Sequence, residues 1–290
     1  MSSSHLSIWT QYIQERFSLV LTPLIVAGIC FSGATLHAKS FLFFPTFISL
    51  IGMLLLFFLF RLMHDVKDFE KDKIANKEYP LPKGLIKIED AKKMIELLKY
   101  GLAGFALIVW VLVNSIAALS YFAILVYLVF MYKDFGFPLW FKGKPVLFAT
   151  FHQFINFLIA IFSVAMTTPQ KAFSLKTLGF GLMLYGAFFT YEICKKLNPQ
   201  SHPILATYRH FYGYRKVFEL AVFQLFLTAI GTISIHAEFF LIPFELLVFF
   251  SLCLLFFQSS FYKVPESAAL VSLLLHVWGV FLFFFFFYLK

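Results

Sequence analysis

Residues 41–60 read FLFFPTFISLIGMLLLFFLF and residues 61–73 read RLMHDVKDFEKDK, and these two adjoining stretches decide the fold class. The first stretch carries no charge and has the length that an α-helix needs to cross a bilayer. The second contains four acidic side chains, at positions 65, 68, 70 and 72. Together they predict a membrane-spanning helix that runs directly into an acidic loop.

The composition of the whole chain agrees with this prediction. Of 290 residues, 61% are hydrophobic and 13% are charged, against about 45–50% and about 25% in an average soluble domain. A soluble core of this size could not bury so much apolar surface, whereas lipid covers it. Nine suitable apolar stretches are found, at about 18–36, 41–60, 97–114, 115–131, 145–166, 174–191, 217–235, 239–257 and 267–288. We therefore expect an all-α membrane protein with nine transmembrane helices, forming one integral membrane domain over residues 1–290.

The basic residues predict an orientation for these helices. If the N-terminus and the segments 61–99, 132–144, 192–216 and 258–266 share one side, that side holds 20 of the 24 lysines and arginines. The positive-inside rule makes this side cytoplasmic, and we expect a multi-pass protein of a bacterial inner membrane. Topology thus explains most of the net charge of +9, and the dispersed charges speak against nucleic-acid binding. The first span lacks a basic leader and is expected to be retained.

Three cysteines and three polar side chains within the spans are further candidates for function. Cys30, Cys194 and Cys253 have neither the spacing of a disulfide framework nor that of a zinc site. His152 and Asn156 lie one helical turn apart in the fifth span, where an interhelical hydrogen bond competes with a role in binding an acceptor. Glu245, in the eighth span, is the most costly side chain to bury, and it has no evident partner in the sequence.

The two longest connections, about 61–96 and 192–216, lie on the same predicted face and direct the search for a site. If the second span continues as a helix, Asp65, Asp68 and Asp72 fall within a sector of roughly 60°. Carboxylates gathered in this way repel one another unless a cation neutralises them, and magnesium fits carboxylates combined with phosphate oxygens. The alternative is a solvated helix with mixed charges. Pro80, Pro82 and Gly84 then predict a turn, and acids at 89 and 90 predict a new helix start.

The pattern His64-Asp65-x-x-Asp68-x-x-x-Asp72, followed by Tyr79-Pro-Leu-Pro-x-Gly84, resembles the first aspartate-rich motif of the UbiA superfamily of intramembrane prenyltransferases. That motif reads Asn-Asp-x-x-Asp-x-x-x-Asp and then Arg-Pro-Leu-Pro-x-Gly. The resemblance covers nearly the whole chain, because nine spans with this motif after the second one match the architecture of the family. It implies a helical bundle around a central cavity, in which Mg²⁺ bridges the aspartates to an isoprenyl diphosphate.

The second motif of the family, Asp-x-x-x-Asp, is altered in this chain. The corresponding place reads Tyr191-Glu192-Ile-Cys-Lys195-Lys196, so that Glu192 replaces the first aspartate and Lys196 the second. A lysine can contact the diphosphate as a point charge in place of a metal. The other possibility is that diphosphate chemistry has been lost.

The resemblance implies roles for individual residues. The implied catalytic residues are Asp68 and Asp72, and the implied metal ligands are Asp65, Asp68, Asp72 and Glu192. The implied diphosphate contacts are His64, Lys67, Lys133, Lys195 and Lys196, and the implied acceptor or cavity residues are His152, Asn156 and Tyr191. The predicted function is Mg²⁺-dependent transfer of a prenyl group to a lipophilic or aromatic acceptor within membrane lipid. The alternatives are a non-catalytic isoprenyl-diphosphate or lipid binder or transporter, and a terpene cyclase on the same scaffold.

Overall fold

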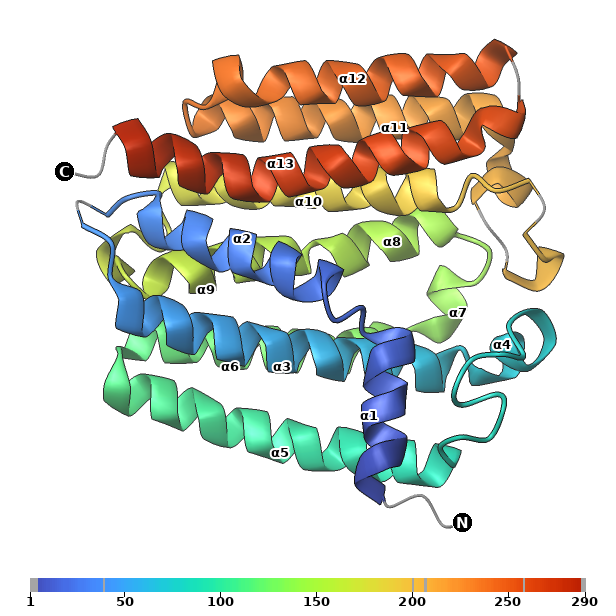
Figure 1. The fold of residues 1–290 in the computed structure, drawn as a ribbon, viewed down its shortest axis with the longest axis horizontal. Coiled ribbons are helices and arrows are strands. Elements are labelled where there is room, and N and C mark those ends of the chain that lie inside the picture. The colour runs from blue at the N-terminus through green and yellow to red at the C-terminus, as the bar shows by residue number, and fades with distance from the viewer. Residues whose placement is uncertain (1–4, 39, 200, 206–207, 258, 288–290) are drawn as a thin grey trace.

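The computed structural model describes residues 5–38, 40–199, 201–205, 208–257 and 259–287, and the described part of the chain is helical with no strands (Figure 1). The α-helices are α1 (His5–Arg16), α2 (Leu21–Thr35), α3 (Phe43–Lys67), α4 (Phe69–Ala75), α5 (Ile88–Leu112), α6 (Ser115–Tyr132), α7 (Pro138–Phe141), α8 (Pro145–Gln153), α9 (Ile155–Ala165), α10 (Leu175–Lys195), α11 (Tyr208–Ser234), α12 (Glu238–Phe257) and α13 (Lys263–Phe287). Short 3₁₀ turns are η1 (Asp134–Gly136), η2 (Pro169–Lys171), η3 (Pro203–Leu205) and η4 (Ser259–Tyr262).

The prediction of a nine-span helical bundle is confirmed. Within the described ranges, eight helices are long and apolar enough to cross a membrane, or nine if the bent pair α1–α2 counts as one span. The long helices lie side by side, and α1 crosses near their ends, bent by 72° from α2 (Figure 1). Each span packs against the next, from α2 through α13, and α13 packs back against α2. The bundle is therefore closed.

Several boundaries differ from those predicted, among them the start of the third span, which begins as α5 at Ile88 rather than at 97. The second span does not end at residue 60 but continues as α3 to Lys67. The fifth span is divided into α8 and α9 at Phe154. The seventh begins at Tyr208 rather than at 217, with a kink at Gly213, where φ is +70°. Glycine adopts this backbone conformation without the steric penalty that a Cβ atom imposes.

Close packing around α10 holds the bundle together. This helix is the most enclosed of the spans, with 72% of its most apolar window buried. It lies directly against α11, where a Cβ atom on Gly231 would stand 2.3 Å from the backbone nitrogen of Met183, and one on Gly186 would stand 2.4 Å from Thr228 Oγ1. In lipid, where apolar burial gives little drive for association, such close backbone contact is a main source of packing energy.

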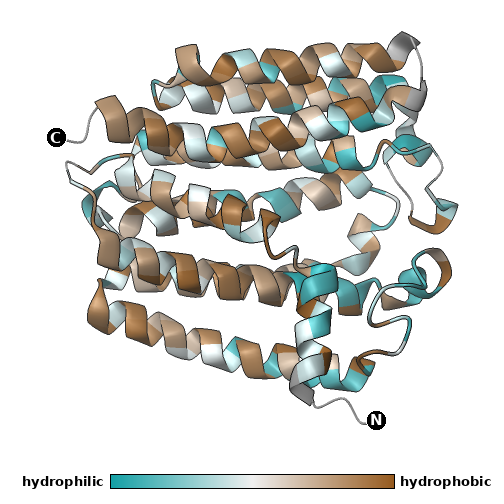
Figure 2. Ribbon diagram, viewed as in Figure 1, coloured by the Kyte–Doolittle hydropathy of each residue, from teal (hydrophilic) through white to brown (hydrophobic). Residues whose placement is uncertain are grey.

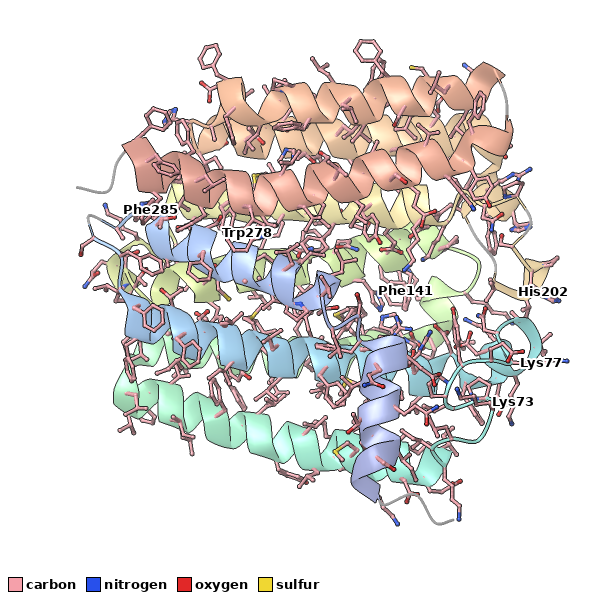
Figure 3. The ribbon with its side chains drawn as sticks, viewed as in Figure 1. Lys73, Lys77, Phe141, His202, Trp278 and Phe285 are labelled. Carbon is pink, nitrogen blue, oxygen red and sulfur yellow. The ribbon has the colours of Figure 1, made fainter. Side chains whose placement is uncertain are left out.

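The charged side chains gather at one end of the bundle, which we call the loop-bearing end. Figure 2 shows that hydrophilic residues, in teal, are concentrated around α1, α4 and the start of α11. Figure 3 shows Lys73, Lys77 and His202 at this end, whereas Trp278 and Phe285 lie toward the other. The long helices between are covered by exposed apolar side chains such as Phe239 and Val111, as expected of a surface that faces lipid. Lys39 and Lys290, two of the basic residues assigned to the opposite face, lie outside the described residues.

The start of α6 provides a test of this fold. The Asn114 side chain accepts a hydrogen bond from the backbone N–H of Ala117 (2.8 Å) and donates one to the carbonyl of Ala165 (2.9 Å), which ties α6 to α9. We expect Asn114→Ala to destabilise the protein by about 1–2 kcal/mol, because it removes a helix cap and leaves a carbonyl unpaired. Asn114→Ser, which retains the cap, should lose less. Thermal unfolding in detergent measures both, and equal midpoints for wild type and Asn114→Ala would contradict the assignment.

Candidate active site

The acidic motif lies where α3 leaves the apolar part of the bundle. The helix ends at Lys67, Asp68 forms the junction, and α4 begins at Phe69. The backbone N–H of Asp68 donates to the carbonyl of His64, and that of Asp72 donates to the carbonyl of Asp68, both at 2.9 Å. The carboxylates therefore keep helical spacing, as predicted, but on two helices with a junction between them rather than on one continuous helix.

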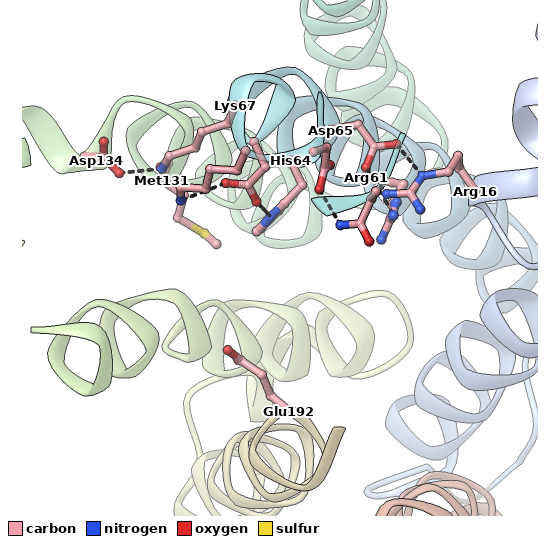
Figure 4. Close-up of polar contacts among 12 residues, drawn as sticks. Arg16, Arg61, His64, Asp65, Lys67, Met131, Asp134 and Glu192 are labelled. Carbon is pink, nitrogen blue, oxygen red and sulfur yellow. Dashed lines mark hydrogen bonds and ion pairs between the residues drawn. The ribbon is translucent and has the colours of Figure 1, made fainter. Parts of the chain in front are cut away.

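Asp65 is enclosed by cations and by a phenol. Arg16 donates to both of its oxygens, from Nε (2.9 Å) and Nη2 (2.7 Å) (Figure 4). Tyr12 donates its hydroxyl to Asp65 Oδ2 at 2.9 Å. Arg61 adds an ion pair at 3.1 Å. The Arg16 guanidinium also stacks 3.6 Å from the centre of the Tyr79 ring. The predicted metal ligand Asp65 thus anchors α1 across the bundle in this structure.

The other two carboxylates of the motif are held differently. Asp68 is partly exposed and pairs with Lys71 (3.2 Å), while His64 Nδ1 stands 4.0 Å away. Burial opposes its ionisation, but nearby His64 and the charge of Lys71 outweigh it, so the pKa of the Asp68 carboxyl lies well below its usual range. Asp72 is buried and accepts a hydrogen bond from Asn76 at 2.7 Å. Its pKa is raised, first by burial and then by the charges of Asp68 and Asp65.

Lys67 points away from these carboxylates. Its ammonium forms an ion pair with Asp134 and donates to the carbonyl of Met131 at 3.0 Å. It also lies 4.7 Å from the centre of the Phe148 ring. Asp134 and the following Phe135 adopt left-handed backbone conformations, with φ of +50° and +53°. The strained turn after α6 thus brings an acid to Lys67, which was predicted to contact the diphosphate.

The second motif is centred on Glu192, near the end of α10. Its carboxylate accepts hydrogen bonds from Gln153 (2.8 Å), Tyr208 (2.7 Å) and Lys196 (2.7 Å). Gln153 in turn accepts from Asn156 at 2.9 Å. Glu192 therefore has three donors, from α8, α11 and its own helix, and Lys196 pairs with it one helical turn later.

The break between α8 and α9 connects the two motifs. His152, the next-to-last residue of α8, places its ring 6.1 Å from the ring of His64, whereas its neighbour Gln153 bonds to Glu192. Figure 4 shows Glu192 on a separate helix, with its carboxylate directed toward the side where His64 and Lys67 lie. Lys195 lies within electrostatic range of Arg61 and Arg16.

The two long loops also meet, since α4 contacts η3. The structure thus brings together the two segments that the sequence analysis singled out.

The remaining predicted residues lie at the margins of this arrangement. Lys133 is an exposed residue at the end of α6, and Tyr191 is partly buried beside Glu192 on α10. Asn156 is buried at the start of α9, and its amide also donates to the Gln153 carbonyl (3.0 Å). Sequence reasoning missed the partners of the two acids, namely Tyr12, Arg16, Arg61, Gln153 and Tyr208. Apart from Arg61, which precedes Asp65 by one helical turn, they come from segments that no local motif connects.

The acidic side chains of the two motifs differ in how well they could hold magnesium. Among the described residues, no group of three or more His, Cys, Asp or Glu side chains is arranged to hold a metal ion. Asp68 and Asp72 nevertheless lie one helical turn apart, and the charge of one raises the pKa of the other. Magnesium is commonly bound by one or two carboxylates, with waters and substrate phosphates completing its shell. The pair Asp68–Asp72 fits this kind of site.

These features define a multi-spanning helical bundle with charged motifs from two loops at one end. No protein-family model matches the chain, and no curated protein matches it. In its fold the chain is similar to a solved structure of digeranylgeranylglyceryl phosphate synthase, with a TM-score of 0.60 at 16% sequence identity, over 94% of this chain and 99% of that one. The chain therefore has the fold of a UbiA-type intramembrane prenyltransferase, as the sequence motif predicted.

The pair formed by Arg16 and Asp65 yields a stability prediction. Both side chains are at least nine-tenths buried. Arg16→Gln leaves the buried Asp65 carboxylate with much of its negative charge uncompensated, so the free energy of unfolding should fall by about 3–5 kcal/mol. It should also release α1, which limited proteolysis near the N-terminus would detect. Arg215→Gln is the matched control, because it breaks an exposed pair with Glu219 worth about 1 kcal/mol or less. Equal unfolding midpoints for the two variants would contradict the anchoring role of Asp65.

Proposed function

We propose that the protein transfers a prenyl group from an isoprenyl diphosphate to a lipophilic or aromatic acceptor in the membrane, with Mg²⁺ as cofactor. The observation that carries this proposal is the meeting of Asp68 and Asp72 with a set of cations at the end of an apolar bundle. A prenyl diphosphate has the same division into a charged head and an apolar tail. The bundle offers lipid-like surroundings to the tail and polar ligands to the head.

The charged residues have complementary roles in this proposal. Asp68 and Asp72 would hold Mg²⁺, and the bound ion would neutralise part of the negative charge of the diphosphate. The head group would draw Arg16 and Arg61 onto its own oxygens, and Asp65 would then be free to act as the predicted further ligand. Lys196 and Glu192 would separate in the same way. His64, Lys67, Lys133 and Lys195 complete the proposed diphosphate contacts.

The reaction itself is a substitution at the allylic carbon. The bond between this carbon and the diphosphate oxygen breaks, and both electrons leave with the diphosphate. Neutralisation of the leaving group by the surrounding cations lowers the barrier to this step. Aromatic rings such as Phe148, which already lies near Lys67, can stabilise the allylic cation. The acceptor then forms the new bond and loses a proton.

The acceptor is proposed to lie against the α8–α9 break and the end of α10. His152 and Asn156 are buried there, and Tyr191 lies nearby on α10. The fold neighbour is, by its name, a synthase of digeranylgeranylglyceryl phosphate, which is a lipid. This neighbour supports a lipophilic acceptor for the present chain. The motif loops and the N-terminus are proposed to face the cytoplasm, in a bacterial inner membrane.

One observation favours the alternative of a non-catalytic binder or transporter of isoprenyl diphosphates. Glu192 is held by three donors and paired with Lys196, so the second motif lacks the free carboxylates that a second metal requires. A site with this charge pattern could retain the diphosphate without releasing it. Labelled isoprenyl diphosphate distinguishes the two functions, because a transferase releases diphosphate when an acceptor is present and a binder does not.

The test of the proposed function is Asp68→Asn. We expect this substitution to abolish Mg²⁺-dependent prenyl transfer in membranes while the protein stays folded, because it removes a partly exposed carboxylate proposed as a metal ligand. Glu70→Gln is the matched control, since Glu70 is an exposed acid on the same segment that pairs only with Lys73 among the described contacts. Release of diphosphate from labelled substrate is the readout. Unchanged turnover in Asp68→Asn would rule out the assignment.

A further inference from the structure

A second ionisable centre lies inside the bundle, between α11, α12 and α13. Glu245 and His276 are almost fully buried, with exposed fractions of 5% and 0%. Their side chains meet at 3.0 Å, between Glu245 Oε1 and His276 Nε2. Thr232 donates its hydroxyl to the same oxygen at 3.1 Å. The histidine thus supplies the partner for Glu245 that the sequence did not reveal.

The hydrogen bonds of His276 show how many protons the pair holds. Nδ1 lies 2.7 Å from the carbonyl oxygen of Ser272. A carbonyl only accepts, so Nδ1 carries a hydrogen. The contact between Nε2 and Glu245 Oε1 then needs one further proton, whether it resides on the imidazole or on the carboxyl. In either form the pair has no net charge, which is what a membrane interior requires.

A small void lies near this pair, with Ser272 between the void and His276. It has a volume of about 10 Å³ and is lined by the polar side chains of Thr190, Thr228 and Ser272 among apolar ones. Ser272 Oγ stands 3.3 Å from His276 Nδ1, so the void reaches the histidine through this hydroxyl. The volume is near the smallest that holds one water molecule.

Two buried polar atoms on α10 and α11 lack a hydrogen-bond partner among the described residues, and the residue that carries one of them lines the void. Thr190 is 2% exposed, and its Oγ1 has no hydrogen-bond partner although it lines the void. Gln224 is equally buried, and its Oε1 is unpaired one turn before Thr228. Buried polar atoms of this kind are normally satisfied by protein or by ordered water. An unpaired hydroxyl on a residue that lines a void of this size indicates a water.

Other ionisable groups on α10 to α13 lie toward the helix ends, belong to phenols and thiols or, in the case of Glu219, are exposed and paired with Arg215. On α10 these are Lys176, Tyr185, Tyr191, Glu192, Cys194 and Lys195, on α11 Tyr208, Arg209, His210, Tyr212, Tyr214, Arg215, Lys216 and Glu219, on α12 Glu238 and Cys253, and on α13 Lys263 and Glu266. Glu245 and His276 are therefore each other's ionic partners.

We propose that Glu245 and His276 form a hydrated proton-binding site within the membrane. One proton is shared between Glu245 Oε1 and His276 Nε2, and one water in the adjoining void bonds to Thr190 and Ser272. The water gives the pair a polar neighbour through which a proton can arrive or leave. This site is separate from the motif loops and does not depend on prenyl transfer.

The shared proton is tested by a hydrophobic carbodiimide, which reacts with protonated carboxyl groups in apolar surroundings. In wild-type protein in nanodiscs at neutral pH, the shared proton is held in the hydrogen bond between Glu245 and His276. The Glu245 carboxyl should therefore react slowly with the carbodiimide. His276→Gln leaves the buried carboxyl to carry its own proton, so we expect its labelling, located by mass spectrometry, to rise several-fold. His236→Gln, at an exposed histidine, is the control and should leave labelling unchanged. An equal rate in wild type and His276→Gln would overturn the shared proton.

The water is tested by Thr190→Val, which removes the hydroxyl and keeps the shape of the side chain. If the hydroxyl binds a water, the thermal unfolding midpoint should fall. If the void is dry, removal of an unbonded buried hydroxyl should leave the midpoint unchanged or raise it, and this result would overturn the hydrated site. Thr46→Val is the matched control, because Thr46 is equally buried and its hydroxyl bonds within its own helix, to the carbonyl of Leu42. It should change the midpoint little.

Discussion

The requirement that a buried carboxylate find a partner governs this structure more than any other constraint. An unpaired charge is costly in protein and more so in lipid, and three acids of this chain are buried or enclosed within helices that span the bundle. Asp65 is satisfied by Arg16, Arg61 and Tyr12, and Glu245 by His276 and Thr232. Glu192 recruits Gln153, Tyr208 and Lys196. Arg61 and Lys196 are local partners, four residues from their acids, but the other partners come from other helices, so that the acids also connect the bundle.

This constraint explains the position of α1. The helix is too short and too polar to serve as a span alone, and it lies across the ends of the long helices (Figure 1). Arg16 at its C-terminal end reaches Asp65 at the end of α3, and Tyr12 one turn earlier reaches the same carboxylate. The sharp bend after α1, where Ser18 has φ of +43°, allows this docking. The N-terminal segment thereby becomes part of the charged end of the bundle.

The sequence predicted the spans and the acidic motif, but it did not predict the partners. Apolar runs identify α3, α12 and α13 because lipid-facing helices must be apolar on their outer surface. The start of α11 was missed because residues 208–216 include Arg209, Arg215 and Lys216, which lower the local hydropathy. The pairing of Asp65 with Arg16 spans 49 residues, and that of Glu192 with Gln153 spans 39. No local spacing encodes such contacts, since they follow from the way the helices pack.

The first motif, with Asp68 and Asp72, and the second motif, with Glu192, differ in how far their negative charge is compensated. This difference indicates which motif would bind the proposed metal. Around Asp68 and Asp72, two carboxylates interact while Lys71 pairs only with the more exposed one. Around Glu192, a single carboxylate is matched by Lys196 and has two further donors. A divalent cation needs uncompensated negative charge, which the first motif has and the second lacks. If a diphosphate lies between them, the first motif would meet it through magnesium and the second through Lys195 and Lys196 directly. The lysine in the second motif is then compatible with catalysis, because it supplies positive charge where a second metal would otherwise be needed.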